Sequence, residues 1–309
     1  MQRLGNPIQT HAGPSSLFES LATADPTFST QRMNLLHGDC MQVLPTLPEY
    51  SVDLVVTSPP YNLGIAYKSF KDTAPRDEFL GWCRAWAAEV KRVMAEDASF
   101  FLNVGAAPAN PLLPHQLVLA LTDGPDPLFV LQNTFHWVKS ITLETRAGDQ
   151  ISAGHFKPIN SKRFVNDCHE YVFHLTKSGA VPLDRRAAGV PYQDKSNIAR
   201  WGHTGGADLR CRGNTWFIPY ETIQSRDKER PHPATFPVAL VEQCIRLHGQ
   251  GPATRLLDPF LGIGTSAIAA QRQKIGTFTG IELDPHYLET ARLRLEVEMN
   301  PRSGELALE

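Results

Sequence analysis

The sequence predicts an α/β fold, in which a mostly parallel, doubly wound sheet carries helices on both faces and one segment is inserted. Short apolar runs rich in Val, Leu and Phe, such as residues 52–56, alternate with longer stretches of helical period. Two of the runs lead into loops rich in Pro or Gly, at residues 57–62 and 258–265. The alternation stops at residues 140–167 and again at 177–231. Alternating strands and helices are typical of parallel sheets, and the interruptions indicate an insertion.

Composition sets the broad class. The chain has 309 residues, of which 42% are hydrophobic and 20% charged, so it is long enough for one large globular domain. It has no apolar run of about 18 residues and no basic-then-apolar start, so we expect a cytoplasmic protein without a membrane segment. The five cysteines are scattered and never spaced as Cys-x-x-Cys. We therefore expect reduced thiols, with neither a disulfide framework nor a zinc site.

The local patterns predict individual elements. Expected strands lie at residues 34–40, 52–56, 98–105, 129–139, 169–175, 254–258 and 276–281, and expected helices at 41–47, 76–95, 111–121, 238–247, 266–273 and 285–295. Residues 1–32 are rich in Pro, Ser, Thr and Gln without a period, and we expect a loosely ordered arm. Trp82 and Trp86 share one face of a helix, which predicts core packing rather than ligand stacking. His169 and His174 are expected to be sheet residues rather than metal ligands.

The loop Thr-Ser-Pro-Pro-Tyr-Asn at residues 57–62 has the chemistry of a binding loop. Consecutive prolines fix φ and remove two donors, while their carbonyl groups remain as acceptors. The Ser58 hydroxyl precedes them and the Tyr61 ring follows, which suits a flat group that bears N–H donors. The alternative is a proline-stiffened strand-to-helix connection with a surface tyrosine.

A second loop, Asp-Pro-Phe-Leu-Gly-Ile-Gly-Thr at residues 258–265, follows a strand and precedes a helix. Glycines let a ligand approach the backbone, and the helix N-terminus offers free N–H groups. Glu282 ends the next strand, where an acid can bind ribose hydroxyls. Asp39 ends the first strand and either faces a ligand or caps a helix. A glycine-rich turn alone could serve any nucleotide.

Together, Ser-Pro-Pro-Tyr-Asn and Asp-Pro-Phe-Leu-Gly-Ile-Gly-Thr resemble the catalytic and cofactor loops of the DNA amino-methyltransferases, which methylate the exocyclic nitrogen of cytosine or adenine. The order of the loops is similar to that of the circularly permuted β class, over about residues 33–299. The resemblance implies a Rossmann-like fold, S-adenosyl-L-methionine as cofactor, double-stranded DNA as substrate and no metal. It divides the chain into an arm (1–32), a catalytic half (33–177), a target-recognition segment (178–230), a cofactor-binding half (231–299) and a tail (300–309).

The resemblance also implies roles for single residues. Ser58 and the carbonyl of Pro59, in a loop stiffened by Pro60, would accept hydrogen bonds from the target amine, and Tyr61 would stack on the flipped base. The residues implied at the cofactor are Asp39, His232, Asp258, Pro259, Phe260, Gly262, Gly264, Thr265 and Glu282. Among these, Asp39 would lie near the adenine, Glu282 on the ribose, and Phe260, with both glycines and Asp258, around the methionine part.

Ser58 bears on the target atom, because cytosine-N4 relatives most often carry Ser at this position and adenine-N6 relatives Asp. We therefore expect N4 of cytosine, with N6 of adenine as the alternative. A methyltransferase for protein or RNA amines and a catalytically dead DNA-binding subunit stay open, although the protein-glutamine enzymes usually carry Asn-Pro-Pro-Tyr. Methylation of ring carbon 5 uses a Pro-Cys pair in its family, and no cysteine here follows a proline. A homodimer, a cognate restriction endonuclease and a prokaryotic, nucleoid-associated location are further expectations from the resemblance.

Charge distribution points to the same partner. The whole chain has a formal net charge of −2, yet residues 157–230 hold 13 Lys and Arg against 8 Asp and Glu, a local balance of +5. Aromatic side chains are interleaved with the basic ones. This combination suits contacts with DNA phosphates and base edges. The alternative is a solvated insertion with a small core of its own.

Overall fold

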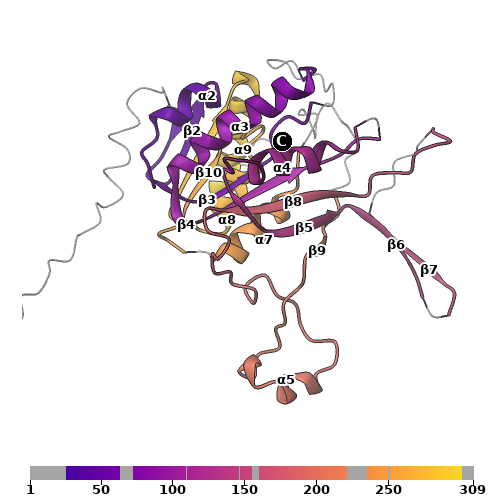
Figure 1. The fold of residues 1–309 in the computed structure, drawn as a ribbon. Coiled ribbons are helices and arrows are strands. Elements are labelled where there is room, and N and C mark those ends of the chain that lie inside the picture. Colours follow the sequence, from indigo (N-terminus) through magenta and orange to yellow (C-terminus); the bar gives the residue numbers. More distant parts are fainter. Residues whose placement is uncertain are drawn as a thin grey trace, which may run out of the picture.

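A computed structural model describes residues 26–62, 72–108, 110–145, 147–154, 160–220, 235–249 and 251–300. Within them, nine strands form one sheet in the order β1-β2-β11-β10-β3-β4-β8-β5-β9 (Figure 1). The strands are β1 (Pro26–Ser29), β2 (Met33–His37), β3 (Val52–Thr57), β4 (Met94–Val104), β5 (Val130–Val138), β8 (His169–Thr176), β9 (Thr215–Phe217), β10 (Arg255–Asp258) and β11 (Thr277–Glu282).

The predicted mostly parallel sheet is confirmed. β2, β11, β10, β3 and β4 run parallel to one another, whereas β8 runs antiparallel between β4 and β5, and β1 antiparallel to β2. β3 follows β2 in the sequence, yet β11 and β10 lie between them in the sheet. The carboxyl ends of these four strands therefore meet at one edge, where open α/β sheets bind their ligands.

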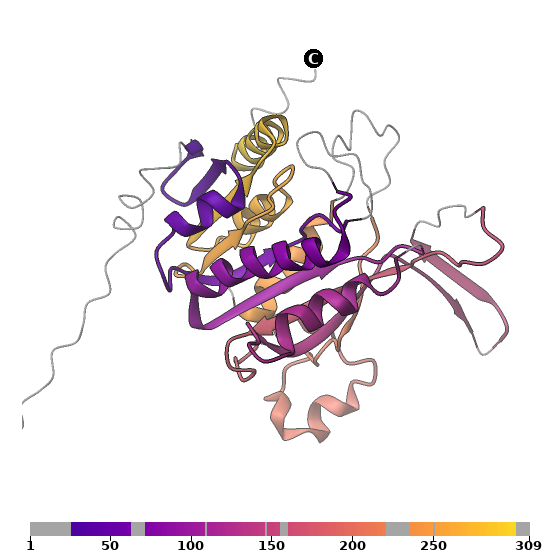
Figure 2. The same cartoon turned by 45° about the horizontal axis from the view of Figure 1, so that its top comes forward.

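Helices cover both faces of the sheet, as predicted. They are α2 (Cys40–Val43), α3 (Arg76–Val93), α4 (Leu113–Thr122), α5 (Ser196–Arg200), α7 (Val238–His248), α8 (Thr265–Arg272) and α9 (Pro285–Met299), with the 3-10 turns η1 (Leu44–Thr46) and η2 (Gly202–Thr204). One core forms under α2, α3 and α4 and the other under α7, α8 and α9 (Figure 2). No helix within the described ranges is long and apolar enough to cross a membrane.

The helices form where the sequence supplies their ends and faces. α3 carries Asp77 and Glu78 in its first turn and Lys91 and Arg92 in its last, which complements the helix dipole. Its apolar face buries Phe79, among others, and the helix ends where β4 begins. α9 starts at Asp284, whose side chain accepts from the amides of His286 and Tyr287. This is the cap expected of an Asp-Pro pair.

The parallel strands are also joined by a side-chain clamp. Arg255 of β10 donates from Nη2 to Oδ1 of Asp53 at 2.6 Å and from Nε to Oδ2 at 2.9 Å, and its backbone amide donates to the same Oδ2. A bidentate pair of this kind fixes direction as well as distance. The clamp thus sets the register of β10 against β3, and with it the relative position of the loops that follow each strand.

The expected N-terminal arm ends earlier than residue 32. Residues 26–29 form the edge strand β1, and Ser29 Oγ donates to Asn34 Oδ1 of β2 at 2.7 Å. Phe28 packs against the second core. Four residues are too few for a readable alternation, so the sequence carries no usable signal for this strand. Residues 1–25 lie outside the described ranges.

The two interruptions of the α/β pattern have different structures. The first contains a hairpin, β6 (Ser140–Glu144) and β7 (Gln150–Gly154), which extends away from the main sheet (Figure 1). The second reaches out around α5 and returns to add β9 to the sheet. Trp216 of β9 is 1% exposed and stacks on Phe135 with ring centroids 4.4 Å apart. The expected target-recognition segment is therefore anchored in the main core along the part that the structure describes.

Candidate active site

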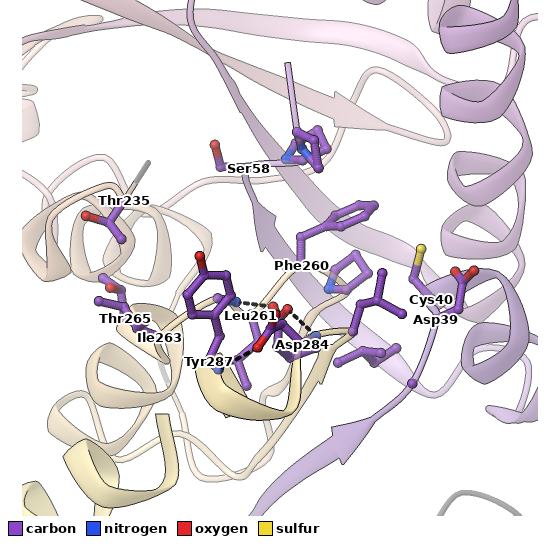
Figure 3. A pocket seen from close by; sticks show the side chains of 18 of the residues that line it. Asp39, Cys40, Ser58, Thr235, Phe260, Leu261, Ile263, Thr265, Asp284 and Tyr287 are labelled. Atoms are coloured by element: carbon purple, nitrogen blue, oxygen red, sulfur yellow. Dashed lines mark hydrogen bonds between the residues drawn. The ribbon is translucent and has the colours of Figure 1, made fainter. Parts of the chain in front are cut away.

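One pocket lies at the carboxyl edge of the parallel strands, and both predicted loops line it (Figure 3). The predicted site residues in its walls are Asp39, Ser58, Pro59, Pro60, Tyr61, Pro259, Phe260, Gly262, Thr265 and Glu282. The empty space between the walls, with the open mouth included, is about 1030 Å³. In Figure 3, Phe260 lies between Ser58 above it and Cys40 and Asp39 on the right.

Asp39 caps a helix and also lies in the wall of the pocket. Its Oδ1 accepts from the amide of Met41 at 2.9 Å, which caps α2. The residue also lines the pocket. The hydrogen bond to Met41 therefore orients a carboxylate that also lies in the pocket wall.

Glu282 ends β11 and is held by the backbone. Its Oε2 accepts from the amide of Gly262 at 2.7 Å and its Oε1 from that of Asp284 at 2.8 Å. Burial raises the pKa of Glu282, and the two amide bonds oppose that rise. Each carboxylate oxygen has a further lone-pair site, so Glu282 can still accept from a ligand hydroxyl. The amide of Gly262 is turned toward Glu282 because this glycine has a left-handed φ of 56°.

Asp258 lies behind the pocket rather than in its wall. It is fully buried, and it accepts from Thr57 Oγ1 at 2.6 Å, Ser266 Oγ at 2.5 Å and the amide of Phe260 at 3.0 Å. Burial raises its pKa to about 6, with these hydrogen bonds acting in the opposite direction. This carboxyl group joins the end of β3 to the cofactor loop and to α8.

Gly264 also lies outside the pocket walls. Its φ is 81°, and a Cβ there would be 2.8 Å from the Cβ of Ala291 in α9. The physical requirement for glycine at this position is thus the contact between α8 and α9. His232, the remaining predicted site residue, lies outside the described ranges.

Several pocket residues were not predicted from the sequence. They include Gly38, Cys40, Trp82, Thr235, Phe236, Leu261, Ile263, Asp284 and Tyr287. Trp86 is fully buried in the core, and Trp82 packs against the same core while also lining the pocket. Phe260 packs edge-on against both, with centroids 5.6 Å from Trp82 and 5.1 Å from Trp86. The position of Trp82, one turn before Trp86, is the signal that could have placed it nearer the loop.

The Ser-Pro-Pro-Tyr loop is bonded to the sheet beneath it. Ser58 Oγ lies 2.5 Å from the Tyr61 hydroxyl, and Asn103 Nδ2 donates to that hydroxyl at 2.8 Å. The hydroxyl also lies 3.1 Å from Glu170 Oε2 and 3.1 Å from the carbonyl oxygen of Asn103. Burial, and then the charge of Glu170, raise the pKa of Tyr61 well above its usual value. Tyr61 is therefore a neutral phenol whose hydroxyl points into the sheet.

Glu170 is paired in turn with Lys139. Lys139 Nζ lies 2.8 Å from Glu170 Oε1, and Asn103 Nδ2 donates to Glu170 Oε2 at 2.7 Å. Burial alone would lower the pKa of Lys139, but Glu170 raises it on balance. These residues come from the ends of β4, β5 and β8, far apart in the sequence, so the motifs gave no sign of them.

Asn62 closes the loop on its far side. It has a left-handed φ of 54°, its amide donates to Asp72 Oδ1 at 2.6 Å, and its Nδ2 donates to the carbonyl of Ala74 at 2.8 Å. Asparagine adopts this conformation at lower cost than most residues. The bonds fix the exit of the loop relative to the start of α3.

Known proteins resemble this chain along most of its length. The sequence profile of the DNA methylase family N6_N4_Mtase matches residues 52–293. Type II methyltransferase M.ScaI of Streptomyces caespitosus is 30% identical over 289 residues, which cover 90% of this chain and 86% of that protein. DNA adenine methyltransferase YhdJ of Escherichia coli (strain K12) is 26% identical over 294 residues, or 92% of this chain and 90% of that protein.

Solved structures share the fold. The PvuII DNA methyltransferase (cytosine-N4-specific) superposes with a TM-score of 0.65 at 21% identity, covering 88% of this chain and 89% of that one. The DNA modification methylase TTHA0409 of Thermus thermophilus, solved with S-adenosyl-L-methionine, gives a TM-score of 0.55 at 24% identity, covering 87% and 94%. The family profile spans well over half of the chain and both predicted loops, and the chain belongs to the N6/N4 DNA methylase family.

Proposed function

We propose that this protein is a site-specific DNA methyltransferase that transfers a methyl group from S-adenosyl-L-methionine to N4 of cytosine, after the base has swung out of the duplex. The observation that carries the proposal is the shared pocket, because Ser58 lines the same cavity as Phe260 and Glu282. A methyl donor and a target amine can therefore meet there.

The pocket residues fit the proposed cofactor. Its sulfonium centre supplies an electrophilic methyl group when bound. Glu282 has acceptor sites for ribose hydroxyls, Asp39 would lie near the adenine, and Phe260 and Gly262 form the wall proposed for the methionine part. Thr265 lines the pocket at the start of α8, and Pro259 stiffens the turn before Phe260. Asp258 and Gly264 are proposed to act indirectly, by holding the loop, and His232 stays a proposed contact.

The remaining residues fit an amine substrate. The lone pair of an exocyclic amine is delocalised into the ring, so the nitrogen is a poor nucleophile. Ser58 and the carbonyl of Pro59 would accept from the two N–H groups and localise that lone pair, while the Tyr61 ring would face the base. The catalytic effect is positioning and electrostatic stabilisation, without a covalent intermediate on the enzyme.

Each of the two candidate target atoms, N4 of cytosine and N6 of adenine, has an observation that supports it. Ser58 favours cytosine N4, and the neighbour of similar fold from the PvuII system is cytosine-N4-specific. The second candidate, N6 of adenine, is supported by the relative from Escherichia coli, which is a DNA adenine methyltransferase. We place cytosine first because Ser58 is part of the loop that would touch the base.

Mass spectrometry decides the atom. The protein is incubated with duplex DNA and labelled S-adenosyl-L-methionine, and the DNA is digested to nucleosides. We expect labelled N4-methylcytosine. N6-methyladenine without N4-methylcytosine would overturn the target atom alone, whereas label in protein or RNA but never in duplex DNA would overturn the proposed substrate.

The cofactor proposal has its own test in Glu282→Ala. The change removes the acceptors for the ribose and also frees the amide of Gly262 from its partner, so the affinity for S-adenosyl-L-methionine should fall about 10- to 100-fold, as expected for charged hydrogen bonds of about 1.5–3 kcal/mol. Isothermal titration calorimetry measures it. Glu298→Ala, which removes a partner of Arg272 on the surface of α9, is the control, and equal affinities for the two variants would contradict the assignment.

A further inference from the structure

A chain of hydrogen bonds leads from the pocket into the sheet and ends at a carboxylate. It starts at Ser58 Oγ, passes through the Tyr61 hydroxyl at 2.5 Å and reaches Glu170 Oε2 after a further 3.1 Å. Ser58 and Tyr61 line the pocket, whereas Glu170 does not. We propose that Glu170, acting through Tyr61, makes Ser58 a hydrogen-bond acceptor and receives the proton that the target amine loses. This inference rests on the proposed function.

The direction of each hydrogen bond in this chain depends on the number of protons that its groups carry. Ser58 and Tyr61 each have one hydroxyl proton, and a carboxylate has only acceptor sites. The negative oxygen of Glu170 favours the Tyr61 proton, which leaves the Tyr61 oxygen to accept from Ser58. The Ser58 proton then points away from the pocket. Asn103 Nδ2 donates to Ser58 Oγ at 3.4 Å, and the second lone pair of that oxygen stays available to the amine. A hydroxyl without such a partner could equally donate, and it would not activate the nitrogen.

The surroundings keep Glu170 in this role. Lys139 binds Oε1 at 2.8 Å, so Oε2 is left for the loop, and Asn103 donates to both Oε2 and the Tyr61 hydroxyl. Gly105 lies against both side chains, because a Cβ there would be 3.1 Å from Glu170 Cδ and 3.1 Å from Tyr61 Cε2. A Cβ at that position would require Glu170 or Tyr61 to shift by a few tenths of an ångström.

The same chain accounts for the proton. After methyl transfer the nitrogen has four bonds and a positive charge. It gives one proton to Ser58, Ser58 gives its own to Tyr61, and Tyr61 gives its own to Glu170, so that a neutral methylated amine and a neutral carboxylic acid result. The side chains of Glu170 and Lys139 are 11% and 17% exposed, so the acid can return its proton to water between turnovers.

The test compares the methylation rate of wild type and Glu170→Gln over a range of pH. The amide keeps the size of the side chain but cannot take up a proton, and kcat should fall about 100-fold, the lower end of the range for proton-transfer groups. The pH dependence of kcat should differ between the two proteins, because only the wild type has an ionisable side chain at position 170. The titratable groups facing Glu170 are Lys139, Tyr61 and His169, and only Glu170 is changed.

Two further comparisons separate this role from a loss of structure. The affinity for S-adenosyl-L-methionine should stay within about twofold, because Glu170 lies outside the pocket walls, and Glu170→Asp should recover part of the rate. Glu96→Gln removes the partner of Lys177 elsewhere on the same sheet and should leave the rate unchanged. Should Glu170→Gln not fold, Gly105→Ala, which keeps every hydrogen-bonding group, should lower kcat in its place.

A double-mutant cycle tests whether Glu170 acts on Ser58 through the Tyr61 hydroxyl. If Glu170 acts through the Tyr61 hydroxyl, Glu170→Gln should cause no further loss of kcat in a Tyr61→Phe background. A further tenfold loss there, or a wild-type rate and pH profile in Glu170→Gln and Gly105→Ala, would overturn the inference while the wild type still methylates DNA. A wild type that methylates no DNA would overturn the proposed function and this inference with it.

Discussion

Ser58 is the residue that we propose to accept a hydrogen bond from the target amine. It is partly exposed to the pocket, and its hydroxyl is bonded to Tyr61 rather than to a backbone group of its own loop. Ser58→Ala should lower kcat about 100-fold, the order of magnitude for one aligned hydrogen-bonding group. Cofactor affinity should not change, because in the proposed mechanism the hydroxyl contacts only the base. Single-turnover methylation and calorimetry measure the two effects.

Ser29→Ala is the matched control for that change. Its hydroxyl donates to Asn34 in β1–β2 and lies apart from the pocket residues. The rate of this variant should equal that of the wild type. A Ser58→Ala enzyme with a wild-type rate would remove Ser58 from the proposed mechanism.

His174 makes the stability of the fold depend on pH. It is fully buried, stacks on Phe101, and its Nε2 and the Nδ1 of His248 both contact Ser99 Oγ, at 3.0 and 3.1 Å. Burial, and then the neighbouring His248, lower the pKa of His174 to about 4. The folded protein therefore favours neutral imidazole. Its contribution to stability is complete above pH 6.5 and is lost as the pH falls toward 4.

The corresponding variant is His174→Gln, which keeps an amide for Asn133 and Ser99 but cannot ionise. Its free energy of unfolding should lose less than that of the wild type between about pH 6.5 and about pH 4, by up to about 3 kcal/mol. Urea unfolding at several pH values measures the difference. Parallel curves for the two proteins would show that another group governs this acid range.

The contact between α8 and α9 depends on one glycine. Gly264 caps α8 in a left-handed conformation, and its Cα faces Ala291 at the centre of α9. Gly264→Val adds both backbone strain and a clash, so the protein should lose at least about 2 kcal/mol of stability. Thermal unfolding without cofactor measures this loss. Gly81→Val, at an exposed position of α3 with open space around the Cα, should cost much less.

The segment around α5 is the element that we propose to read DNA. It extends from the sheet, and Arg200 and Arg210 are exposed on it. Arg200→Ala and Arg210→Ala should each weaken DNA binding. Loss of a phosphate contact should weaken binding to all DNA sequences equally and reduce its salt dependence. Loss of a base contact should cost about 1–3 kcal/mol of binding free energy and relax specificity. Binding titrations at several salt concentrations distinguish the two.

Arg292→Ala on α9 is the control for the recognition segment. Its guanidinium is occupied by Glu289 and Glu296 of the same helix, so DNA affinity should stay at the wild-type value. Exchange of the whole segment should change the methylated sequence, and an unchanged sequence would move recognition to another element.

Most helices and strands followed from the sequence, because their ends carry strong local signals. α3, α9 and β8 lie within about two residues of their expected limits at most ends, where Pro, Asp or a Gly turn interrupts the pattern. Local sequence patterns could not predict the hairpin β6–β7, because its residues are largely exposed. They could not predict the short strand β1 either. The pocket was predictable where a motif names its residues, as at Ser58 and Phe260. Glu170 and Lys139 were not predictable, since only the fold brings Glu170 to Tyr61 and Lys139 to Glu170.

Viewed as a whole, the molecule brings its two motifs together through one buried carboxyl group. Asp258 accepts from Thr57, which is 201 positions earlier in the chain, and from Ser266, near the start of the following helix. The sequence showed an acid in a glycine-rich loop, and the natural expectation was a ligand contact. Its partners are hydroxyl groups whose positions only the assembled sheet defines. The distance between catalytic and cofactor loops is therefore set by the core rather than by either loop.

The strand order has a consequence for how the protein is made. β10 and β11, near the end of the chain, lie between β2 and β3, which the ribosome produces among the first. Until translation passes residue 282, β2 and β3 each lack a neighbour, and their backbone groups remain open to pairing with another chain. The central sheet cannot close during synthesis of the first half, so nascent and truncated chains should depend on chaperones to stay soluble.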